Sequence, residues 1–128
     1  MDADRFEELV ALALETLPDE IAARIDNVDI EVREWPTREQ ARAAGARGLL
    51  LGLYQGVPLT RRHSSYGMVL PDRITIFQGP IEAISRSEAE LVDQVRDTVV
   101  HEVAHHFGIS DERLREIERD RRARQARR

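Results

Sequence analysis

The chain has no cysteine among its 128 residues. Disulfide bonds are therefore excluded, and so are zinc sites built on thiolates. Any zinc would have to be held by nitrogen and oxygen ligands. Lysine is absent as well, because arginine accounts for all 19 of the lysine and arginine residues.

The sequence gives no reason to expect a targeting segment or a membrane span. The first residues, MDADRFEEL, are acidic and lack the apolar core of a signal peptide. No apolar run is long enough to cross a bilayer. The net charge of −5 gives no overall field that favours nucleic acid. We expect a cytoplasmic protein with no membrane or nucleic-acid partner, and nothing in the sequence indicates a homo-oligomer.

The length suits one domain, residues 1–128, with a genuine core but no room for a second one. Apolar residues at helical spacing predict a packing helix over residues 3–16. Strict alternation then predicts a half-buried strand over residues 28–35, which ends at Pro36. Thr37 is a good N-cap for a short helix over Arg38–Ala44.

Two further strands are predicted in the middle of the chain. The largely apolar run Leu49–Gly56 predicts a strand that is covered on both faces. Residues 57–68 are rich in turn formers and show no period. Residues 73–78 are β-branched and aromatic, and the Gly79-Pro80 pair after them predicts a strand at the sheet edge. An extended peptide could pair with such an edge.

The longest predicted helix begins at a capping box, Ser87 to Glu90, and runs to Phe107. At about 100° per residue its valines and Leu91 gather on one side, while His101 and His105 fall on the opposite side. Core packing would thus fix the direction of the two imidazoles. His106 lies within the apolar arc, so we expect a satisfied core or interface histidine there.

The residues HEVAHHFGISD, at the end of this helix, predict a metal site. His101 and His105 are one turn apart, so both imidazoles can bind one ion at about 2.0–2.1 Å. Gly108 can adopt the left-handed conformation that turns the chain back, which brings the Asp111 carboxylate to the same ion. This set leaves one tetrahedral position open for water, which is typical of catalytic zinc. Glu102 points toward the outer sphere of the metal without ligating it. We expect one Zn²⁺ per chain.

The end of the chain predicts a last helix from Asp111 to about Arg119, capped by Ser110, with Leu114 and Ile117 facing inward. The Arg-rich tail after about residue 119 is expected to be frayed helix or disordered. A solvated end is the simplest interpretation, and contact with an acidic partner or nucleic acid is the alternative.

The motif HExxHxxGxxD, as it stands at residues 101–111, resembles the Asp-zincin variant of the metzincin signature. Together with residues 48–60, 64–81 and 97–114, it is similar to the small bacterial mini-zincins, which are zinc peptidases of one minimal metalloprotease-like domain. The resemblance implies an α+β fold, in which a small mixed sheet of three to four strands packs on the active-site helix between N- and C-terminal helices. It also implies the zinc ligands His101, His105 and Asp111 and a catalytic Glu102.

The resulting hypothesis is hydrolysis of peptide bonds in a peptide or protein substrate. Zinc would activate a water molecule, and Glu102 would act as the general base. Tyr66, in the irregular SSYG segment, is the best candidate for an oxyanion helper, with His63 or Arg62 as alternatives.

Two other interpretations stay open. In the first, a metal-binding domain without turnover serves as an interaction module. The absence of a substrate subdomain favours it, as does the absence of a Met-turn, since Met1 and Met68 both precede the motif. The retained Glu102 favours the peptidase. The second alternative is a metal-dependent RNase, which ranks last because that family carries three histidines without this glutamate.

Overall fold

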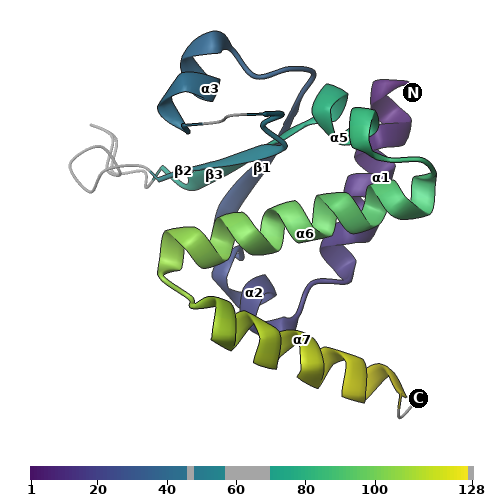
Figure 1. Ribbon diagram of the computed structural model, residues 1–128, viewed down its shortest axis with the longest axis vertical. Coiled ribbons are helices and arrows are strands. Elements are labelled where there is room, and N and C mark those ends of the chain that lie inside the picture. Colours follow the sequence, from purple (N-terminus) through teal and green to yellow (C-terminus); the bar gives the residue numbers. More distant parts are fainter. Residues whose placement is uncertain (46–47, 57–69, 127–128) are drawn as a thin grey trace.

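Residues 1–45, 48–56 and 70–126 are described by the computed structural model of the chain, which has an α+β fold (Figure 1). The helices in these residues are α1 (Ala3–Glu15), α2 (Asp19–Arg24), α3 (Arg38–Ala43), α5 (Gln78–Ile84), α6 (Glu88–Phe107) and α7 (Asp111–Ala126). The strands are β1 (Val28–Arg33), β2 (Gly52–Gln55) and β3 (Asp72–Phe77). This mixed fold, with helices at both ends of the chain, confirms the predicted fold class. In the part of the chain described, no helix is long and apolar enough to cross a membrane.

The sheet has the order β1-β3-β2, with β1 parallel and β2 antiparallel to β3. The prediction that residues 73–78 form an edge strand is therefore wrong, because β3 is central and Ile74 and Ile76 are fully buried. The Gly79-Pro80 pair does not mark an edge but begins α5. Pro80 lies in the first turn of that helix, where its missing N–H is not needed. A peptide cannot pair with β3, since both of its sides are occupied.

β2 is an edge strand and is shorter and more exposed than predicted. Its burial falls from Gly52, which is buried, to Gln55, which is exposed, so the prediction of cover on both faces is wrong. The apolar run has a different explanation in the structure. Leu51 packs against the core, whereas Leu50 and Leu53 line a surface cavity beside α6.

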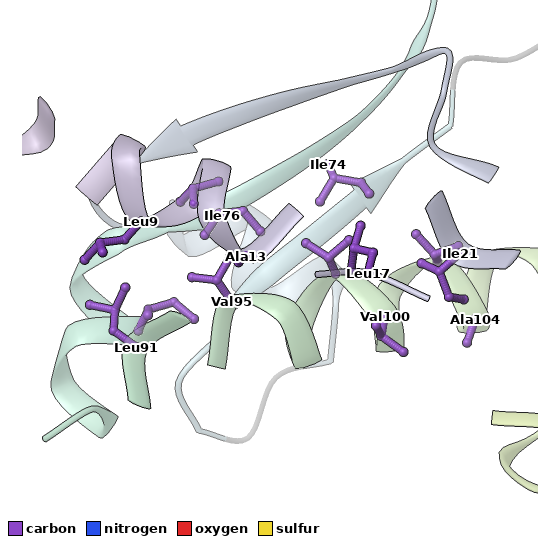
Figure 2. Packing of buried hydrophobic residues seen from close by; sticks show 14 of the residues in the cluster. Leu9, Ala13, Leu17, Ile21, Ile74, Ile76, Leu91, Val95, Val100 and Ala104 are labelled. Atoms are coloured by element: carbon purple, nitrogen blue, oxygen red, sulfur yellow. The ribbon is translucent and has the colours of Figure 1, made fainter. Parts of the chain in front are cut away.

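The hydrophobic core joins α1, β3 and α6. Leu9 and Ala13 of α1 face Ile76 of β3 and Val95 of α6, as Figure 2 shows. The predicted apolar side of α6 is the buried side, and its buried hydrophobic residues are Leu91, Val95, Val99, Val100, Val103 and Ala104. Burial of a side chain of this kind stabilises the fold by about 1.5–3 kcal/mol. One side of α6 is therefore held against the rest of the domain.

Both ends of α6 are those that the sequence predicts. Ser87 caps the first turn, where its hydroxyl accepts a hydrogen bond from the Glu90 N–H at 3.1 Å. Gly108 ends the helix in the left-handed conformation, with φ of 70°. α7 begins at Asp111 as predicted but continues to Ala126, beyond the expected end near Arg119. Arg124 contributes to this extension, because its guanidinium contacts the Asp19 carboxylate of α2 at 2.8 Å.

An exposed ion pair links the first turns of α1 and α6. The Arg5 guanidinium donates Nε to Glu88 Oε2 at 3.0 Å and Nη2 to Glu88 Oε1 at 2.6 Å. This bidentate contact lowers the pKa of Glu88, chiefly through the hydrogen bonds from Arg5. The same contact, with a second one to Glu8, raises the pKa of Arg5.

The substitution Glu88→Gln should lower the thermal stability at neutral pH and have less effect in acid. Because the folded-state pKa of Glu88 is lowered, its contribution is present above the pKa of an unfolded glutamate and is lost as the pH falls through the lowered value. Melting temperatures measured across this acidic range, with the α1 variant Glu7→Gln as a control, check this. A difference between wild type and Glu88→Gln that does not change with pH would contradict it.

Candidate metal centre on helix α6

The four residues of the predicted metal site lie around one surface cavity. His101, Glu102 and His105 project from the side of α6 that is not buried in the core, and Asp111 is the first residue of α7. His101, His105 and Asp111 are exposed, while Glu102 is half-buried. All four line a cavity of about 600 Å³, together with Leu50 and Leu53 from the β2 region. The turn at Gly108 thus returns the chain so that Asp111 reaches the same cavity as the histidines.

These side chains are not assembled into a finished ligand set. In residues 1–45, 48–56 and 70–126, no group of three or more His, Cys, Asp or Glu side chains is close enough to hold a metal as placed. Binding by His101, His105 and Asp111 would require at least one of them to move. Because all three are exposed, a change of rotamer is sterically open to them. The donor types, two imidazole nitrogens and one carboxylate, are those that a catalytic zinc accepts.

His101 is oriented by the turn of helix that precedes it. Its Nδ1 lies 2.6 Å from the backbone carbonyl oxygen of Asp97, one turn earlier in α6. A ring that donates its Nδ1–H to this carbonyl has a free electron pair at Nε2, which is the nitrogen able to bind a metal. The sequence did not identify this partner, because the acceptor is a backbone atom and any residue type at position 97 would supply it.

Glu102 is held by the edge strand. Its Oε1 accepts a hydrogen bond from the Tyr54 backbone N–H of β2 at 2.9 Å. This contact was not predicted from the sequence, and neither was the place of Tyr54 in the site. The strand pattern alone gave no signal for it, because the register between β2 and α6 decides which amide faces the helix.

The side chain of Tyr54 connects the same strand to the end of α6. Its hydroxyl donates to Asp72 Oδ2 at 2.6 Å, and Asp72 is buried at the start of β3. Its ring stacks on His106, with the ring centroids 3.9 Å apart and an interplanar angle of 18°. Phe107 packs edge-on against the same two rings. Tyr54 and His106 line the cavity together with Glu102, and Phe107 supports these two rings.

His106 was expected to be a core or interface histidine, and the structure places it against Tyr54 of β2 and not in the core. Its side chain is 37% exposed, and its Nε2 lies 3.9 Å from Asp72 Oδ2. The physical reason is its place in the last turn of α6, where the neighbour is the Tyr54 ring of the edge strand and not the core. The predicted oxyanion helper Tyr66 lies outside the described residues, as do its alternatives His63 and Arg62.

A close approach between β2 and α6 sets the position of this wall. A Cβ atom on Gly52 would lie 2.6 Å from Thr98 Cγ2 and 3.1 Å from the Thr75 carbonyl oxygen. Thr98 is buried, and its hydroxyl donates to the Gln94 carbonyl at 2.8 Å, so it has little room to move away. Glycine at position 52 therefore allows the strand to lie against the helix that carries His101 and Glu102.

A comparison with protein families identifies the family of the chain. The sequence profile of zincin-like metallopeptidases matches residues 25–121, which is most of the chain and includes the whole HExxHxxGxxD motif. The chain belongs to the zincin-like metallopeptidase family. This finding confirms the family resemblance that the motif indicated.

The fold of this zincin-like chain is similar to a solved structure, a conserved hypothetical protein from Thermus thermophilus. The TM-score is 0.52 at 23% sequence identity, and the alignment covers 84% of this chain and 94% of the other. At this identity the likeness concerns the fold alone. No curated protein matches the chain.

The substitution Gly52→Ala should destabilise the domain by about 1–3 kcal/mol, because the added methyl group overpacks the contact between β2 and α6. Gly48→Ala is a matched control, since a Cβ there would meet no atom of the described residues within 4 Å. Urea denaturation of both variants measures the effect. Equal stability of Gly52→Ala and wild type would show that the close approach is not a constraint.

Proposed function

We propose that this zincin-like chain is a zinc-dependent peptidase that uses Glu102 as its general base. The observation that carries the proposal is the shared cavity, which His101, Glu102, His105 and Asp111 line together. Membership of a zincin-like metallopeptidase family supports a hydrolase. The substrate class would be a peptide or protein.

In this proposal His101, His105 and Asp111 hold one Zn²⁺ per chain. A bound zinc ion lowers the pKa of its water to around 7 and polarises the carbonyl group of the scissile bond. The contact from His101 Nδ1 to the Asp97 carbonyl supports this role, because it orients the ring with Nε2 free for the ion.

Glu102 would move the proton. Its Oε1 is anchored by the Tyr54 N–H, whereas no hydrogen bond to its Oε2 is found within the described residues. An anchored carboxylate presents its second oxygen in a fixed direction, so that it can accept a proton from water and pass it to the leaving amine. Glutamate is needed because this role requires a group that binds and releases a proton.

A second candidate function is a metal-binding interaction module without turnover. The observation that favours it is the lack of a Met-turn after the motif, since both methionines of the chain, Met1 and Met68, precede it. A module of this kind would bind zinc and a partner protein but would have no use for Glu102.

Replacing Glu102 by glutamine should lower the rate of peptide hydrolysis by about 10²–10⁴-fold, because the amide cannot accept the proton from water. Zinc content should stay the same, since Glu102 is not a proposed ligand. Digestion of a peptide library by the zinc-loaded protein, together with elemental analysis of the metal, measures both quantities.

The control is Asp93→Asn, which neutralises an exposed carboxylate on α6 outside the cavity and should leave hydrolysis unchanged. Full activity of the Glu102→Gln variant would end the proposal. Zinc binding by the wild-type protein without any hydrolysis would favour the interaction module.

A further inference from the structure

A second cavity, of about 680 Å³, lies between α6 and α7 and borders the proposed metal site. His101 and Asp111 line both this cavity and the one described above, so the two cavities adjoin at these residues. Several positively charged side chains line this second cavity. We call it the arginine groove, after Arg96 of α6 and Arg115, Arg119 and Arg122 of α7.

The geometry of α7 explains why three arginines face the groove. Arg115, Arg119 and Arg122 are spaced by four and three residues, so they lie on one face of the helix. The helix is fixed from other directions, since Leu114 and Ile117 are buried in the core. In Figure 1, α7 passes beside α2 and diverges from α6 toward the C-terminus.

Ion pairs hold the other face of α7 in place. Arg113 Nη2 contacts Glu20 Oε2 at 2.9 Å, and Arg124 Nη1 contacts Asp19 Oδ2 at 2.8 Å, so two arginines are matched to acids of α2. The hydrogen bond to Glu116, together with the contact with Glu20, raises the pKa of Arg113. The arginines of α7 are therefore divided into a paired set and a set that faces the groove.

The arginine groove carries more positive charge than its own acids neutralise. Within the described residues, Arg115, Arg119 and Arg122 form no ion pair. Arg96 contacts Asp97 at 3.2 Å, and its Nε is buried without a hydrogen-bond partner. This local excess contrasts with the net charge of −5 of the whole chain.

We propose that the arginine groove binds the carboxylates of an acidic peptide segment, so that the preferred substrate is rich in Asp or Glu on one side of the scissile bond. Guanidinium groups match carboxylates well, because they can donate two parallel hydrogen bonds to one carboxylate. The position of the segment next to the scissile bond rests on the proposed function, whereas binding of the segment does not.

A peptide fits the groove better than RNA does. Asp97, Asp111 and Glu118 also line it, and a continuous phosphate backbone would have to pass these carboxylates. A peptide with spaced acidic side chains can meet the arginines and avoid the acids. The chain as a whole is also acidic, which disfavours a polyanion of high charge density.

The test uses zinc-loaded Glu102→Gln protein, so that binding is measured without hydrolysis. The probes are two fluorescein-labelled ten-residue peptides, one alternating Gly and Glu and the other alternating Gly and Gln, followed by fluorescence anisotropy. The Glu peptide should bind about tenfold more tightly than the Gln peptide. Equal affinities would overturn the proposal.

Two triple variants with the same change of charge locate the binding. Arg115→Gln, Arg119→Gln and Arg122→Gln together should weaken binding of the Glu peptide by about tenfold. A control triple variant should leave binding of the Glu peptide unchanged, because its three positions lie outside the groove. It combines Arg33→Gln, Arg38→Gln and Arg86→Gln. An equal loss in both would overturn the proposal, because net charge alone would explain it. Circular dichroism checks folding, and the single exposed variant Arg119→Gln should show a partial loss if the triple is unstable.

Two further measurements separate the possible failures. The first uses a labelled ten-nucleotide oligouridine. If it binds more tightly than the Glu peptide, through the same three arginines, the ligand of the groove is RNA and the proposal is overturned.

The second is digestion of a peptide library by wild-type protein, which should give cut sites enriched in Asp or Glu on one side. Hydrolysis without enrichment, and without preference for the Glu peptide, would reject the groove and leave the peptidase intact. Binding as expected without hydrolysis would support the groove and reject the peptidase.

Discussion

The burial of one side of α6 is the constraint on which the rest of the structure depends. Val95, Val99 and Val103 are fully buried, and they hold the helix against α1 and β3. Because a helix has a fixed angle between successive side chains, burying this side also fixes the direction of His101 and His105. The residues that stabilise the fold and those that would bind a metal are thus parts of one helix, and the rigidity of the first supports the geometry of the second.

Two neighbours complete the site from opposite sides of α6. β2 lies close because Gly52 has no side chain, and its Tyr54 N–H anchors the Glu102 carboxylate. α7 returns after Gly108 and presents Asp111 to the same cavity. The proposed base and the three proposed ligands therefore line one cavity, and the arginine groove adjoins it at His101. No part of the described chain forms a separate substrate domain.

The sequence was informative wherever local chemistry decides the structure. Ser87, Gly108 and the apolar side of α6 were correctly predicted, because caps, left-handed turns and helical periodicity depend on residues near one another. Sheet order was not, since nothing local shows that β3 is central. The contact from Tyr54 to Glu102 could not be predicted from the sequence either. It depends on how β2 and α6 are aligned, and the two residues are 48 positions apart in the chain.

The central claim is that His101, His105 and Asp111 converge on one ion, and zinc X-ray absorption spectroscopy of the loaded protein tests it most directly. The account predicts four nitrogen or oxygen ligands at about 2.0–2.1 Å, with the outer-shell scattering of two imidazoles. The Asp111→Ala variant should lose one oxygen ligand or most of its zinc. A spectrum with fewer than two imidazoles, or one that the Asp111 substitution leaves unchanged, would contradict the account.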